Sequence, residues 1–203
     1  MSNFDAKAMA IDMVALCKNM IKSPFQTINA EIAKGRSWKI TMTAQVLPLL
    51  VLVAIIAFIL NIVSGNPISI IATILEPIFG AAGLLLFAFI MGKIAPMLGG
   101  KDDLDKAFSV TFLTMIPMMV ISIIFNVLTF LALLSLILLV YTIYLLYKAA
   151  GEQLDVTKLP QRIILVVAPM VICIVIMMII SPAMPHQPMP EEFAGMEHMN
   201  IPK

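Results

Sequence analysis

The sequence GKIAPMLGGKDDLDKAFSVTFLTMIP, residues 92–117, is a strongly charged stretch in the middle of a very apolar chain. Its charged side chains are Lys93, Lys101, Asp102, Asp103, Asp105 and Lys106. On both sides the chain continues as uncharged runs, and about 20 apolar helical residues suffice to cross a bilayer. We therefore predict that residues 92–117 carry a cytoplasmic loop between two transmembrane helices.

Composition supports a membrane protein. Of the 203 residues, 61% are hydrophobic and only 12% are charged, whereas soluble domains are about 25% charged. The net charge of +1 provides no basic field, so we expect no nucleic-acid partner. Cys17 and Cys173 form neither a disulfide framework nor a metal-binding spacing, and lipidation of Cys17 stays open as an alternative.

The first 39 residues predict two amphipathic helices and no secretory signal peptide. In residues 4–22, apolar side chains recur at three- and four-residue steps; they are Met9, Met13, Leu16 or Cys17, and Met20. Ser23-Pro24 then predicts a helix start with Gln26 completing a capping box, and Gly35 a helix end. The stripe of this second helix is Phe25, Ile28 and Ile32. These helices either lie at the membrane surface, with Lys34, Arg36, Lys39 and Trp38 at the headgroups, or pack on the bundle.

Five transmembrane spans follow, and the predicted fold class is an all-α, polytopic bundle with N-terminal amphipathic interfacial helices. The spans are expected at Thr41–Val63 with a kink at Pro48, and at about 77–95, 107–126, 129–148 and 163–181. The region 68–95 is too long for one crossing, so we place a short outer helix at 68–75 and a break at Glu76-Pro77. We also expect Pro117 inside the third span and an interruption of the fifth at Pro169.

The uncharged run 110–147 has 38 residues and would form a helix of roughly 57 Å, nearly twice the ~30 Å hydrocarbon core. We therefore predict a hairpin of two spans with its turn at 126–129, followed by a charged loop at 148–162. This layout puts twelve of the thirteen basic residues on one side. By the positive-inside rule the N-terminus is then cytoplasmic and the C-terminus outside. The expected parts are residues 1–39, a membrane domain 40–182, and a disordered extracytoplasmic tail 183–203.

The spans lack the side chains that catalysis and ion coupling require. No ionisable residue is expected in hydrocarbon, which argues against ion-coupled transport, and no catalytic or cofactor motif is present. Asp102, Asp103 and Asp105 suggest a solvated loop and a helix cap rather than a metal site. Soft ligands in the tail leave a copper(I) site open as an alternative; they are His186, Met189, His198 and Met199.

Two groups of span residues are expected to serve packing. We predict that the polar side chains bond to nearby backbone or between helices; they are Thr43, Gln45, Thr111, Thr114 and Ser122. The small residues of the second span favour close packing within the bundle over a dimer face; they are Gly80, Ala81, Ala82, Gly83, Ala88 and Gly92.

Residues 92–117 also resemble a known family. A span ending at Gly92-Lys93, then Leu98-Gly99-Gly100, an acidic-basic turn, an amphipathic entry and Pro117 in the third span are similar to the Yip family, the Ypt-interacting proteins. Three further features agree: Pro24 within Ser23-Pro24-Phe25, the stretch YLLYKAAGEQLDVTK beginning at Tyr144, and the five-span layout. The resemblance covers residues 20–182.

The resemblance implies a compact, prokaryotic-type member in the cytoplasmic (inner) membrane. The Asp-Leu-Tyr-Gly-Pro motif and the Gly-Tyr pair of eukaryotic relatives are missing, so binding of Rab-type GTPases is not carried over. We expect a non-enzymatic membrane scaffold that recruits protein partners at its cytoplasmic face or organises the bilayer, with a homo-oligomer left open. The alternative is a small transporter or channel for a neutral or amphipathic solute, with the prolines breaking helices around a cavity.

Overall fold

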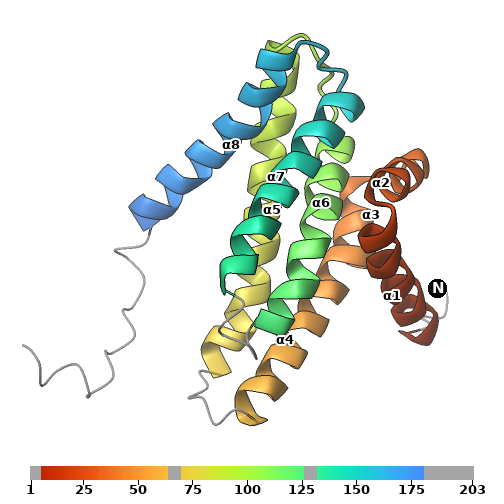
Figure 1. The fold of residues 1–203 in the computed structure, drawn as a ribbon, viewed down its shortest axis with the longest axis vertical. Helices are drawn as coiled ribbons and strands as arrows, with labels where there is room; N and C mark the ends of the chain where they lie inside the picture. The colour runs from red at the N-terminus through yellow and green to blue at the C-terminus, as the bar shows by residue number, and fades with distance from the viewer. Residues whose placement is uncertain (1–5, 64–69, 126–131, 181–203) are drawn as a thin grey trace, which may run out of the picture. The chain divides into compact units, whose positions relative to one another are not determined.

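A computed structural model describes residues 6–63, 70–125 and 132–180, and all regular structure in these ranges is helical (Figure 1). The elements are α1 (Ala6–Lys22), α2 (Pro24–Ala33), α3 (Trp38–Thr41), the π-helix η1 (Met42–Val46), α4 (Leu47–Val63), α5 (Ile70–Met97), α6 (Leu104–Phe125), α7 (Ala132–Gln153) and α8 (Leu159–Ile180). The chain divides into two units, Met1–Cys173 and Ile174–Lys203. The contacts below all lie within the first.

Five helical stretches are long and apolar enough to cross a membrane. They are Trp38–Leu60, Pro77–Met97, Leu104–Ile121, Ser135–Gln153 and Leu159–Ile176. In the span of α6, 56% of the residues are buried, against 17% in the span that contains α4. Since α6 contacts α5, α7 and α4, it is the central helix of the bundle. The predicted polytopic helical bundle is confirmed.

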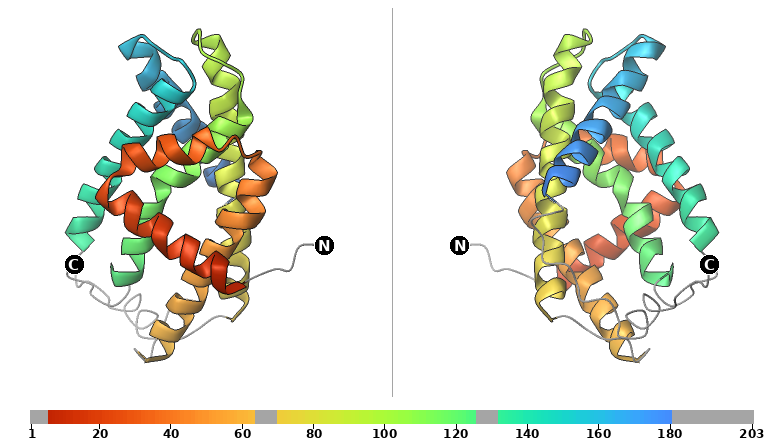
Figure 2. Two further views of the ribbon diagram at one scale, coloured as in Figure 1. Left: turned by 90° about the vertical axis from the view of Figure 1, so that its right-hand side faces the viewer. Right: turned by 90° about the vertical axis from the view of Figure 1, so that its left-hand side faces the viewer.

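The N-terminal helices pack on this bundle. Figure 2 shows α1 and α2 as a V laid across α6, and both helices contact it. Met13, Leu16 and Met20 of α1 and Ile28 of α2 are buried, because the predicted apolar stripes face α6. Of the two predicted arrangements, packing on the bundle is therefore found. The exposed side of α1 is mixed, with the apolar side chains Ile11, Val14 and Ile21 beside Lys18 and Lys22.

The start of α2 differs in detail from its prediction. Pro24 is the first residue of the helix, as expected, but Ser23 makes no side-chain cap hydrogen bond, so the capping box with Gln26 is not formed. Instead the Ser23 carbonyl accepts hydrogen bonds from the N–H and the hydroxyl of Thr27, at 3.0 and 2.9 Å. Gly35 ends the region with φ of +61°, which glycine adopts without steric cost.

The first span begins with a widened turn. Residues 42–46 are π-helical, and the N–H of Leu47 bonds to the carbonyl of Met42, five residues earlier. Pro48 follows directly. A proline ring clashes with the carbonyl four residues before it, here that of Ala44, and the wider turn moves this carbonyl away. The irregularity expected from Pro48 is thus a π-bulge one turn earlier.

Two predicted interruptions are wrong. α5 is continuous from Ile70 to Met97 with Pro77 inside it, so there is no separate 68–75 helix and no break at Glu76-Pro77. α8 is likewise continuous through Pro169. A proline costs one backbone hydrogen bond, whereas a full break in lipid would leave several polar groups without partners.

The run 110–147 forms two helices, α6 and α7, which pack against each other. The length argument for a hairpin is confirmed, while the predicted turn at 126–129 lies outside the described residues. The charged loop after the fourth span is shorter than predicted. α7 continues through Lys148 to Gln153 and α8 begins at Leu159, because Ala149, Ala150 and Gly151 pack as buried helical residues.

Candidate functional site

α5 and α7 end side by side, each in a tight C-terminal turn. Gly99 has φ of +81°, the Gly100 N–H bonds to the Ala95 carbonyl at 2.9 Å, and the Gly99 N–H bonds to that of Pro96 at 3.1 Å. This is a Schellman motif, in which a left-handed residue lets the chain cap the last carbonyls. At the end of α7, Asp155 takes the left-handed position with φ of +57°.

The two turns are joined through Gly100 and Lys101. The Lys101 N–H donates to the Leu154 carbonyl at 2.9 Å, and Lys101 Nζ lies 2.6 Å from Asp155 Oδ2. A Cβ on Gly100 would overlap the Leu154 carbonyl oxygen and lie 2.7 Å from Val156 Cγ2. Residue 100 must therefore be glycine for the two loops to touch.

Charge reinforces this contact. Hydrogen bonding and attraction to Asp155 raise the pKa of Lys101, and the same contacts with Lys101 lower the pKa of Asp155. Both side chains are more than half exposed, so solvent screens the pair and its contribution to stability is small. The Lys101–Asp155 ion pair helps to align two loops that are already joined by the Lys101–Leu154 backbone hydrogen bond and by the close contact at Gly100.

The start of α8 is fastened to the end of α7. Arg162 Nε donates to the Val156 carbonyl at 2.6 Å. Its side chain runs over Gly151, where a Cβ would lie 2.6 Å from Arg162 Cδ. The sequence analysis assigned no packing role to Gly151 or Arg162, because they lie eleven residues apart in two different helices.

α2 and the start of the first span join the same region. Gln153 Nε2 donates to Asn29 Oδ1 at 2.7 Å, which ties α7 to α2. The N–H of Trp38, the first residue of α3, donates to Asp105 Oδ1 at 2.7 Å. A carboxylate from α6 thus caps the N-terminus of α3, where the unpaired N–H groups and the helix dipole favour negative charge.

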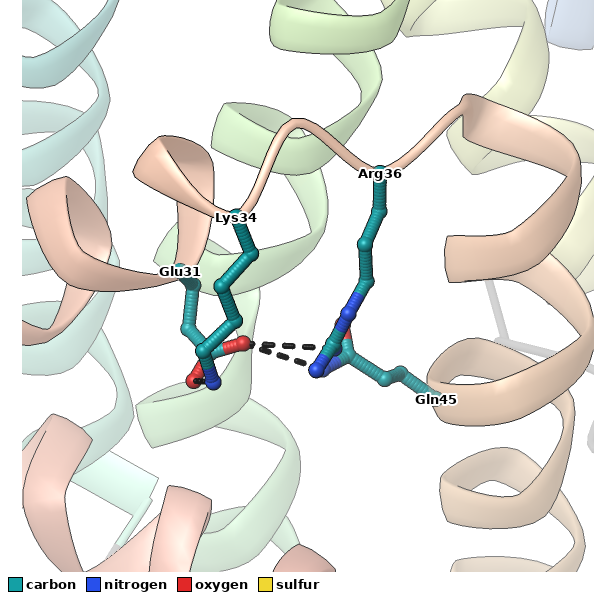
Figure 3. A network of polar contacts seen from close by, with 4 residues as sticks. All are labelled: Glu31, Lys34, Arg36 and Gln45. Atoms are coloured by element: carbon teal, nitrogen blue, oxygen red, sulfur yellow. Dashed lines mark hydrogen bonds and ion pairs between the residues drawn. The ribbon is translucent and has the colours of Figure 1, made fainter.

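A second cluster connects α2 to the π-helical turn of the first span (Figure 3). Glu31 pairs with Lys34, lies 3.3 Å from Arg36 Nη1 and accepts a hydrogen bond from Gln45 Nε2 at 3.3 Å. Its side chain is 15% exposed, so the carboxylate is largely shielded. Gln45 bonds to a residue of another helix, which is one of the two arrangements predicted for the polar span residues. Glu31 had no predicted role.

We call α2, residues 34–38, residues 98–103 and residues 152–158 together the polar end. All four segments lie at one end of the spans, because each is bonded to another or to α6 or α7. This is the arrangement predicted from the charge pattern for the loops that follow the second and fourth spans.

The acidic residues of the 98–103 loop have separate partners. Asp102 Oδ2 pairs with Lys93 at 2.8 Å. Asp103 Oδ1 accepts the Lys106 N–H at 2.9 Å, so it caps α6 as predicted. Asp105 caps α3. Over residues 6–63, 70–125 and 132–180 there is no group of three His, Cys, Asp or Glu side chains able to hold a metal. The tail residues proposed for copper(I) lie outside the described residues; they are His186, Met189, His198 and Met199.

The structure brings some of the family-motif residues together. Gly100 of the Leu98-Gly99-Gly100 motif contacts the segment that begins at Tyr144, through Leu154 and Val156. The ring of Phe25, next to Pro24, meets the ring of Tyr144 edge-on at 6.2 Å. Two further motif residues, Gly92 and Pro117, lie within α5 and α6.

Gly92 and Pro117 are both buried, but they differ in position. A Cβ on Gly92 would lie 3.6 Å from Ala107 Cβ, an ordinary contact distance, so Gly92 lies where α5 packs against the start of α6. Pro117 lies four turns into α6, away from the polar end. Gly80 similarly faces Leu50 of α4. These contacts agree with the predicted packing role of the small residues.

Local bonding also accounts for the polar residues of the spans. The hydroxyls of Thr43, Thr111 and Thr114 donate to the carbonyls of Lys39, Ala107 and Val110 at 3.0, 2.8 and 2.9 Å, as predicted. The side chain of Ser122 lies outside the described residues. Buried Thr142 has no hydrogen-bond partner for Oγ1 among the residues the structure describes, and nothing in the structure explains this.

Comparison with known families agrees with this arrangement. The Yip1 domain matches residues 18–180. The chain belongs to the Yip1-domain family. The match begins within α1 and ends at the last residue of α8, so this Yip1 domain includes α2, all five spans and both loops of the polar end. No curated protein and no solved structure matches the chain.

Proposed function

We propose that this Yip1-domain protein is a non-enzymatic scaffold of the prokaryotic inner membrane, which recruits protein partners through the polar end. The observation that supports this is the joining of four segments, distant in sequence, into one charged surface. Its exposed charged side chains include Lys101, Asp102, Glu152, Asp155 and Lys158. Loops that hydrogen bonds and ion pairs already join lose little conformational entropy on binding, so such a surface suits the docking of a partner.

The polar end is proposed to face the cytoplasm. It carries Lys34, Arg36, Lys101 and Lys158, and positive charge is retained on the cytoplasmic side. Along the spans the exposed side chains are apolar instead, for example Ile55, Ile137 and Val140, which suits contact with lipid tails.

Site-specific photocrosslinking in native membranes tests the scaffold. A photoreactive residue at Glu152 or Lys158 should give the same discrete protein adduct, and the matched position Ile137 on α7 should not. Lys101→Glu should weaken the adduct, because it reverses a charge on the docking surface. Adducts that are equal at Ile137, or absent from both polar-end positions, would contradict the proposal.

The alternative, a small transporter or channel for a neutral or amphipathic solute, rests on prolines that break helices. Pro77, Pro117 and Pro169 instead lie inside continuous helices, so the scaffold is better supported. Solute flux into liposomes that contain the purified protein, above the flux of empty liposomes, would reverse this preference.

A further inference from the structure

A groove opens between α1, α4 and α6, below the polar end. Its volume is about 300 Å³, at the small end of ligand pockets, and it is lined mainly by Met13, Cys17, Lys18, Leu49, Val53 and Val120. All of these side chains are apolar except Lys18. Neither the scaffold function nor any motif of the sequence uses this groove.

The position of the groove can be placed against the polar end. Gln45 reaches Glu31 of α2, so Gln45 lies at the depth of the charged cluster. Leu49 and Val53 follow four and eight residues later, about 6 and 12 Å farther along the helix. The groove therefore lies deeper than the charged cluster, among the apolar parts of the spans, and Val120 on its α6 side is about 24 Å along the helix from Leu104.

We expect the open side of the groove to face lipid. Ile11, Val14 and Ile21, on the outer face of α1, are between 54% and 63% exposed. An amphipathic helix with such a face lies within the membrane interface. An apolar occupant could thus enter sideways from the bilayer without crossing water.

Lys18 adds charge selectivity. Its side chain is exposed at the edge of the groove, and it forms no ion pair with any residue that the structure describes. A lysine at this depth extends its ammonium group toward the headgroups. A phosphate there would supply the missing counter-charge, while the attached acyl chain would fill the apolar groove.

We propose that the α1–α4–α6 groove binds one anionic glycerophospholipid, with an acyl chain between α1 and α4 and the phosphate at Lys18. The lipid then joins α1 to the bundle. This proposal does not depend on the scaffold function. Protein adducts at Lys158 test the scaffold and lipid contacts at Lys18 test the groove, so either proposal can fail without the other.

Photocrosslinking with lipids that carry a diazirine on the acyl chain tests the site. The full-length protein is placed in nanodiscs with equal amounts of photoreactive phosphatidylglycerol or phosphatidylcholine. Label should concentrate on the peptides around Cys17 and Val53, with phosphatidylglycerol favoured about fivefold, the equivalent of ~1 kcal/mol for one lysine–phosphate contact. Lys18→Gln should abolish this preference, whereas the matched variant Lys22→Gln, one turn away, should keep it.

Filling the groove provides a second test. Val53→Trp should remove label from these peptides for both lipids, and Ile55→Trp, on the exposed face of α4, should leave it. Equal labelling by both lipids in the wild type, equal loss in Lys18→Gln and Lys22→Gln, or label that persists in Val53→Trp would overturn the proposal.

Cys17 supplies a readout that does not depend on folding of the tryptophan variant. In Cys173→Ala protein, phosphatidylglycerol should slow the reaction of Cys17 with a maleimide several-fold more than phosphatidylcholine does. Burial raises the pKa of the Cys17 thiol above 9.0, so the reaction is run at alkaline pH. A disulfide between the Cys17 residues of two copies would identify a second chain as the occupant and refute the lipid.

Discussion

Replacing Gly100 by alanine should separate the two loops of the polar end. The new Cβ would overlap the Leu154 carbonyl oxygen, and would lie 2.7 Å from Val156 Cγ2 and 3.1 Å from the Ala95 carbonyl oxygen. Because backbone blocks it on two sides, no rotamer change relieves the overlap. Overpacking costs about 1–3 kcal/mol, and loss of the Lys101 N–H bond to Leu154 costs about 1 kcal/mol more.

The expected destabilisation is therefore about 2–4 kcal/mol, which lowers the melting temperature of a chain of this size by roughly 10 °C. The assay is the fraction of folded protein that remains on size-exclusion chromatography after heating, in one detergent. Two variants serve as controls. Gly83→Ala, in an open helical position, should be neutral or slightly stabilising. Gly99→Ala has space but keeps φ of +81°, so it should cost about 1–2 kcal/mol.

Equal melting of Gly100→Ala and the wild type would refute the close approach of the loops. If Gly99→Ala lowered the melting temperature more than Gly100→Ala did, backbone conformation, and not the contact with α7, would be the reason for the glycine pair.

Three further predictions concern the polar end. Glu31→Gln should destabilise the protein by about 1–2 kcal/mol, because it removes the charge from a shielded cluster; unchanged melting in the same heating assay would contradict this. Asp105→Ala should cost about 1 kcal/mol by removing the cap of α3 and should alter the fluorescence of Trp38, whereas Asp105→Asn should retain most of both; equal spectra for the two variants would count against the cap. The attraction between Lys101 and Asp155 should be complete between their usual pKa values, 10.5 and 3.8. It should be lost as the pH falls through the lowered pKa of Asp155 or rises through the raised pKa of Lys101. The difference in melting temperature between the wild type and Lys101→Met should therefore be flat from about pH 5 to 9, and a slope within that range would exclude this pair as its source.

Predictions made from a residue and its immediate neighbours in sequence were wrong where several interactions compete. The sequence predicts a break at Glu76-Pro77, since a residue before proline avoids helical geometry. In the structure α5 continues through Pro77, because a helix in an apolar environment loses less by giving up one hydrogen bond than by exposing several. The capping box at Ser23 failed because the Ser23 N–H, which the Gln26 side chain would bond, donates to the Asn19 carbonyl at 2.8 Å.

The candidate site was only partly predictable. The pattern of charge predicts that the two loops share one side of the membrane, and the acidic loop residues include a predicted helix cap, Asp103. Side-chain partners that are far apart in sequence could not be predicted in the same way. Trp38 and Asp105 are 67 residues apart, and Asn29 and Gln153 are 124 apart, so no local spacing relates them.

Length, hydropathy and the distribution of charge determine by themselves that this chain is a five-span helical membrane protein, because the thickness of a bilayer and the cost of burying charge do not depend on how the helices pack. Only the tertiary structure decided what residues 92–117 do. Gly99 supplies the left-handed turn that caps α5, whereas the need for a residue without a side chain at Gly100 arises from the neighbouring end of α7. Packing against a segment that is distant in sequence sets this second role, so no local sequence pattern could predict it.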